Sequence, residues 1–272
     1  MDSTQNQKNL VESLAQLAAA AMTFQEVNGI PVVHLPEGHE VHDLEGLLPH
    51  PTQIRVEVKL FTLDAFIDYF LQHNLPNSAI FARNKDEHDF TAIIDFHQRG
   101  EPAWGRHRAT YPCMTSTEWT LWTGENGKKM TQEAFATFLE DNLGDIVSPD
   151  GASMLEVATT LQVKRNVEFQ SSTRLSDGQV QFSYQETQKG STNKGMVEIP
   201  ERFVLGIAPF HGGERYELTA RLRYRLDGGR VVFWYDLLRP DKIQEEAFNR
   251  MVQTVEEKTK TKPFMGWAPI NR

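Results

Sequence analysis

The chain has 272 residues, of which 39% are hydrophobic and 24% charged, so its composition is that of a folded protein and not of a disordered or fibrous one. A net charge of −9 makes bulk nucleic-acid binding unlikely, because an acidic surface repels phosphate. The single cysteine, Cys113, excludes an internal disulfide and a zinc site built from paired cysteines. The apolar run from Leu10 to Met22 is too short and too polar for a membrane span or an export signal. We therefore expect a cytoplasmic protein without a membrane partner.

Charge is distributed unevenly along the chain. Residues 1–150 carry 22 acidic and 10 basic side chains, whereas residues 151–272 carry 15 acidic and 18 basic ones. The two halves would attract each other, or the halves of another copy. We predict four parts: an N-terminal helical arm over 1–30, an acidic α+β part over 31–150, a helix plus antiparallel β part with a C-terminal helix over 151–258, and a tail over 259–272.

The N-terminal half predicts strands mixed with amphipathic helices. Apolar residues at helical spacing predict a first helix over about 9–21. Gly and Pro enclose a β-branched run that predicts a strand within 29–36, and strict alternation predicts a half-buried strand over 54–60. Thr62 is a suitable N-cap for a helix over 62–73. The apolar face of that helix is predicted to consist of Leu63, Phe66, Ile67, Phe70 and Leu71.

Two further strands are predicted over 78–82 and 90–97, on either side of a polar turn over 83–89. Thr131 is predicted to cap a second helix, and a third is predicted over about 153–163. The side chains of the second helix that are predicted to point inward are Phe135, Phe138 and Leu139.

From Val167 onward the hydrophobic period changes from helical to two, which predicts an antiparallel meander. Its strongest part is a hairpin closed by Asp227-Gly228-Gly229. Asp241 is predicted to begin a final amphipathic helix, followed by an irregular basic tail from Lys258. The predicted fold class is α+β, with a mixed N-terminal part and a C-terminal antiparallel β meander that ends in a helix.

The densest polar cluster of the sequence includes Asp95, His97 and His107. On a strand, Asp95 and His97 would share one face, and a carboxylate oriented toward a histidine is the minimum for acid/base chemistry. No nucleophile, metal or nucleotide motif accompanies them, so a structural hydrogen-bond network is the favoured interpretation. Cys113 would need a base such as His107 to act as a nucleophile.

Arg221, Arg223 and Arg225 alternate with apolar residues, so they share one strand face and form a candidate ligand-binding site for phosphate or carboxylate. The favoured alternative is an ordinary solvated face. The sequence HEVHD, which contains His39, His42 and the adjacent acid, is too weak a signal for a metal site, and no metal or cofactor is predicted.

Several phrases of the sequence together resemble the YfdQ-like family of phage and prophage proteins, over about residues 31–250. The phrases are DLEGLLPHP, LDAFIDYFLQH, FTAIIDFH, PAWGRHRATY, EWTLW, MTQEAFATFLEDN, IPERFVLGIAPFHGG, RLRYRL and FWYDLLRPD. The resemblance implies an origin in a mobile element and a bacterial cytoplasm. It carries over no activity and no catalytic residue.

Three functional hypotheses follow. The preferred one is a phage or prophage accessory protein without enzymatic activity, which assembles as a homo-oligomer. The second is a small-molecule or nucleotide binder that uses the arginine strand face to hold a small phosphorylated ligand. The third and weakest is a metal-dependent hydrolase or nuclease built on Asp95, His97 and His107.

Overall fold

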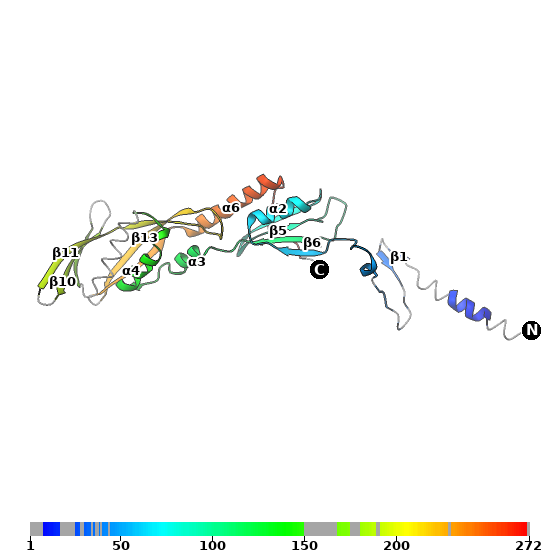
Figure 1. Cartoon of the computed structure of the whole chain (residues 1–272), viewed down its shortest axis with the longest axis horizontal. Helices are drawn as coiled ribbons and strands as arrows, with labels where there is room; N and C mark the ends of the chain where they lie inside the picture. Colours follow the sequence, from blue (N-terminus) through cyan, green and yellow to red (C-terminus); the bar gives the residue numbers. More distant parts are fainter. Residues whose placement is uncertain are drawn as a thin grey trace, which may run out of the picture. The chain divides into compact units, whose positions relative to one another are not determined.

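The computed structural model describes residues 8–16, 25–27, 30–33, 35, 38, 40–42, 44–149, 168–174, 180–188, 191–227 and 230–270. The chain forms two units, Met1–Ile54 and Arg55–Arg272 (Figure 1). The helix predicted over 153–163 lies outside the described residues. The elements of both units give the chain an α+β fold, as the sequence predicts.

The described residues of the first unit form little regular structure. Residues 8–16 are helical, β1 (Gln25–Val27) pairs with β2 (Ile30–Val32) in antiparallel fashion, and η1 (Glu45–Leu47) is a single 3-10 turn. These bounds confirm the described part of the predicted first helix and shorten the strand predicted within 29–36. None of the described residues of this unit is buried. Its large apolar side chains that are at least half exposed are Leu10, Val11, Leu14, Val27, Ile30, Val41, Leu44, Leu47, Leu48 and Ile54.

The second unit contains a five-stranded sheet with the order β15-β4-β5-β6-β3. Its strands are β3 (Val56–Lys59), β4 (Ala79–Lys85), β5 (Glu87–Ile93), β6 (His107–Pro112) and β15 (Phe264–Met265). The two edge strands pair in parallel with their neighbours, and the central pairs are antiparallel. Helices α2 (Leu63–His73) and α6 (Pro240–Thr259) lie on the same side of this sheet (Figure 1). They bury its apolar face in one hydrophobic core.

Helix α2 begins where the sequence predicts. The Thr62 hydroxyl accepts a hydrogen bond from the backbone N–H of Ala65, which satisfies a donor at the helix N-terminus. Phe66, Ile67 and Phe70 are buried as predicted, but Leu71 is 47% exposed. Because successive helical residues are about 100° apart, Leu71 lies at the margin of the buried face.

The polar turn predicted over 83–89 is wrong, because most of these residues belong to strands. β4 continues to Lys85 and β5 begins at Glu87, so that Asp86 alone, with φ 64°, makes the reversal. Arg83 forms an ion pair with Asp89, its partner on the opposite strand. Cross-strand pairing therefore places these charged residues in the ladder.

The second sheet of this unit has the order β7-β14-β13-β12-β8. Its strands are β7 (Met130–Thr131), β8 (Ile146–Ser148), β12 (Arg202–Ile207), β13 (Tyr216–Asp227) and β14 (Arg230–Leu237). Helices α3 (Thr117–Gly124) and α4 (Gln132–Asp141), followed by the 3-10 turn η2 (Leu143–Asp145), contribute to its core. Thr131 caps α4 by accepting from Ala134 N–H, as predicted.

The predicted meander is antiparallel but belongs to two sheets. β9 (Glu168–Arg174), β10 (Val180–Gln188) and β11 (Ser191–Ile199) form a three-stranded sheet, whereas β12 to β14 belong to the five-stranded one. The predicted hairpin forms from β13 and β14, but Asp227, which is predicted to be part of the turn, ends β13 and pairs with Arg230.

The C-terminal tail is more ordered than predicted. After α6, β15 extends the first sheet by pairing in parallel with β4, and Gly266 N–H donates to the carbonyl oxygen of Ala82. Arg108 donates to the carbonyl oxygen of Pro269 at 2.8 Å, and the Arg83 guanidinium lies 4.4 Å from the Trp267 ring centroid. The tail is therefore part of the fold.

Candidate functional site

The Asp95 carboxylate accepts backbone hydrogen bonds at the start of strand β6. β5 ends at Ile93, so Asp95 and His97 lie beyond the strand, and the prediction that they share a strand face is wrong. The two carboxylate oxygens of Asp95 accept hydrogen bonds from the backbone N–H groups of Arg106 at 3.1 Å and His107 at 2.9 Å. This arrangement fixes the chain where it enters β6.

His107 is buried beside Tyr69 and His73 of helix α2. Its Nε2 atom lies 2.8 Å from the Tyr69 hydroxyl, and its ring centroid is 5.3 Å from that of His73. Burial is the main reason why the pKa of His107 is lowered, and the neighbouring His73 adds to the effect. His97 is exposed, and its Nδ1 accepts from Ala103 N–H at 3.0 Å. Asp95 contacts His107 through the backbone N–H of that residue, and the side chains of Asp95, His97 and His107 do not form one chain of proton transfer.

Metal coordination has no support in the part of the chain that the structure describes. Within it, no three His, Cys, Asp or Glu side chains are grouped so that they could hold an ion. His42 is described, but His39 and Asp43 lie outside the described residues.

The three predicted arginines lie on the face of β13 opposite to buried Leu218 and Ala220, as the alternation indicates. Arg223 Nε donates to Asp236 of β14 at 3.0 Å. Arg225 is exposed.

Sequence reasoning missed Arg202, which stands directly opposite Arg221 in the β12–β13 ladder. Neither guanidinium forms a hydrogen bond or ion pair with any residue that the structure describes, and Arg221 Nε is shielded from solvent without a partner. Like charges in directly opposite positions destabilise a sheet, and an unpaired buried donor adds to the cost. An anion between the two guanidinium groups would reduce their repulsion and would accept a hydrogen bond from Arg221 Nε.

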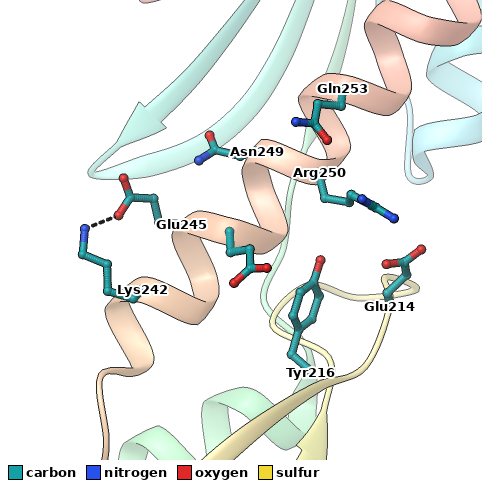
Figure 2. Close-up of a pocket in the computed structure, with 8 residues that line it drawn as sticks. Glu214, Tyr216, Lys242, Glu245, Asn249, Arg250 and Gln253 are labelled. Atoms are coloured by element: carbon teal, nitrogen blue, oxygen red, sulfur yellow. Dashed lines mark hydrogen bonds and ion pairs between the residues drawn. The ribbon is translucent and has the colours of Figure 1, made fainter.

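A groove between α6 and residues 209–216 was not anticipated (Figure 2). These residues comprise most of the connection between β12 and β13 and the first residue of β13. Its inner part is a cavity of about 410 Å³ with apolar walls from Leu63, Phe210 and Met251. Its outer part is an open cleft along α6. Glu214, Tyr216 and Arg250 line both parts, so the two parts adjoin at these residues.

The polar side chains of this groove converge. In Figure 2 the Arg250 guanidinium, the Tyr216 hydroxyl and the Glu214 carboxylate point into the same space. The pKa of Tyr216 is raised, first by burial and then by the carboxylates of Glu214 and Glu246, while Arg250 acts in the opposite direction. A mostly apolar cavity with a few converging polar groups is the usual form of a small-molecule site.

The connecting segment 208–215 owes its shape to glycine and to backbone hydrogen bonds. Gly212 has φ 71°, a conformation that side chains rarely adopt, and a Cβ on Gly213 would lie 3.1 Å from the carbonyl oxygen of Phe210. His211 N–H donates to the carbonyl oxygen of Met114 at 2.9 Å. Backbone hydrogen bonds and the buried Phe210 ring therefore hold the groove wall in place.

These features define an α+β protein with two candidate ligand surfaces, the arginine strand face and the α6 groove. The family model for "Uncharacterized conserved protein (DUF2303)" matches residues 4–268, and the chain belongs to this family. No curated protein and no solved structure matches the chain. Among the described residues, no helix combines the length and the apolar character that crossing a membrane requires.

Proposed function

We propose that the protein is an accessory protein of a phage or prophage, without enzymatic activity, which works as a homo-oligomer in the bacterial cytoplasm. The resemblance of its sequence phrases to phage and prophage proteins supports the origin. A single cysteine, Cys113, fits a reducing compartment. The observation that carries the oligomer is the exposure of most large apolar side chains in the described part of the first unit.

The helix over 8–16 has an exposed apolar stripe. Leu10 and Leu14 are one helical turn apart, and with Val11 they form an apolar stripe whose members are 57–64% exposed. Each such side chain gains about 1.5–3 kcal/mol when it is fully buried. Most of the stability of a helix in a protein comes from packing of its apolar face, so this exposed stripe favours a partner surface. A second copy supplies an identical stripe, and self-complementary contacts of this kind are the commonest basis of homo-oligomers.

The test compares the full-length chain with the double variant Leu10→Ser/Leu14→Ser. Light scattering after gel filtration should give a mass of at least two chains for the wild type and of one chain for the variant. The matched control is Glu12→Gln, which changes a residue of the same helix without altering its apolar stripe, and it should keep the wild-type mass. A wild type that stays monomeric at micromolar concentration and physiological salt contradicts the proposal.

The Arg202–Arg221 pair favours a second candidate function, the binding of a small phosphorylated ligand. Guanidinium groups bind phosphate oxygens through paired hydrogen bonds, and two of them facing each other suit a single phosphate. Such binding should weaken with added salt, since exposed charge contacts are screened over about 8–10 Å.

A fluorescent nucleotide and a labelled oligonucleotide, titrated at two salt concentrations, test this function. Arg221→Ala should weaken nucleotide binding at least about tenfold, whereas Arg239→Ala, which changes an arginine paired with Asp241, should not. Binding that is absent in the wild type, or equal in Arg221→Ala, would refute it.

A further inference from the structure

The geometry points to the α6 groove as a binding site for an apolar α-amino acid, with its carboxylate on Arg250, its ammonium group beside Glu214 and its side chain in the inner cavity. Three features of the groove support this site: its paired charges, its unpaired charges, and the position of the unpaired charges next to the apolar walls.

Several charged residues around the groove already have partners. Lys242 forms an ion pair with Glu245, and Asp64, at the inner end, receives a hydrogen bond from Lys258 at 2.8 Å. The two charges within each pair neutralise each other, so these four residues contribute little net charge to the groove.

The remaining charges are of both signs. Arg250, Glu214 and Glu246 form no hydrogen bond or ion pair through their side chains with any described residue, although all three act on the Tyr216 hydroxyl. A phosphate on Arg250 would lie among two uncompensated carboxylates, which disfavours a doubly charged anion. A ligand with one positive and one negative group can pair its negative group with Arg250 and its positive group with a carboxylate.

The apolar walls determine the third feature of the ligand. Leu63 at the start of α2, Phe210 of the connecting segment and Met251 of α6 face the cavity of about 410 Å³. This volume falls within the range of small-molecule sites. Because Met251 follows Arg250 directly on α6, the charged and apolar walls adjoin, as the α-carbon of an amino acid requires.

The Tyr216 hydroxyl completes the polar end. It points toward Arg250 and Glu214 in Figure 2, so it can donate to the ligand carboxylate or accept from the ammonium group. Burial and the nearby carboxylates raise its pKa, which keeps the hydroxyl protonated at neutral pH.

Calorimetric titration of the full-length protein with four related compounds tests the inference. The probes are L-phenylalanine, L-leucine, 3-phenylpropionate, which lacks the ammonium group, and phenethylamine, which lacks the carboxylate. Both amino acids should bind, and the two single-charge analogues should bind at least about tenfold more weakly than phenylalanine. Equal binding of phenylpropionate and phenylalanine would overturn the assignment of Glu214. The absence of saturable binding by either amino acid at millimolar concentration would overturn the site.

Variants then locate the binding. Arg250→Ala should lose phenylalanine binding by at least about tenfold, and Glu214→Gln should weaken phenylalanine but not phenylpropionate. Arg239→Ala, on the residue that precedes α6, is the matched control and should bind as the wild type does. Circular dichroism spectra establish that each variant is folded, and Arg250→Gln, which removes the charge but keeps a long polar side chain, serves if the alanine variant is not. Wild-type affinity in a folded Arg250 variant would show that the ligand binds elsewhere.

Discussion

Replacing Asp95 with alanine removes the acceptor of two backbone amides at the start of β6, those of Arg106 and His107. A hydrogen bond to a charged group contributes about 1.5–3 kcal/mol, and the partial exposure of Asp95 lets water replace some of it. We expect a total loss of about 2 kcal/mol in the free energy of unfolding. Asp95→Asn should cost about half as much, because the amide oxygen still accepts one of the two bonds.

Thermal melts of the full-length protein measure this loss. In a folded unit of this size, about 2 kcal/mol lowers Tm by about 4–8 °C. The matched control is His97→Ala, which loses one exposed hydrogen bond to Ala103 N–H and should change stability by less than about 0.5 kcal/mol. Equal melting points for wild type and Asp95→Ala would refute the structural role assigned to this carboxylate.

Burial lowers the pKa of both His88 and His107, so below the unfolded value of 6.5 the unfolded chain binds protons that the folded chain does not. Stability should therefore fall as the pH decreases from about 7 to 5 in urea melts, less steeply in His107→Gln, and a flat wild-type profile would contradict this. Phe248→Ala removes a fully buried ring stacked on Phe90 and should cost about 3–5 kcal/mol; a shift of the urea midpoint worth less than about 1 kcal/mol would show that the core refills. Burial raises the pKa of the Cys113 thiol, which should react with Ellman's reagent only after unfolding, so rapid reaction of the native protein would reveal local opening.

The elements that the sequence predicts well are those with local signals. Thr62 and Thr131 cap their helices by accepting a hydrogen bond from the backbone N–H three residues later. Both partners lie in one short segment, so the cap can be predicted without knowing the rest of the fold. The β13–β14 hairpin is equally local, since the turn signal predicted at 227–229 lies where its two strands meet in the sequence. In contrast, β15 has two residues, and only its pairing with distant β4 makes it a strand.

The candidate sites depend on contacts that no short-range pattern encodes. The alternation of Phe203 and Leu205 places Arg202 on the polar face of its strand, but its position opposite Arg221 is set by the eight-residue connection that follows β12. Arg250 and Glu214 come from separate elements, and their convergence follows from the packing of α6. The opposite error occurs at Asp95 and His97. Because they are close in sequence, they are predicted to share a strand face, but β5 ends at Ile93, before both of them.

Strand β15 also protects an edge. A strand at the margin of a sheet presents unpaired N–H and C=O groups that can template pairing with another chain. Phe264 and Met265 occupy this position along β4, and Gly266 extends the pairing to Ala82. Versions of the protein shortened before residue 264 would therefore expose the edge of β4 and favour strand-to-strand aggregation, so an affinity tag is better added after the tail than in place of it.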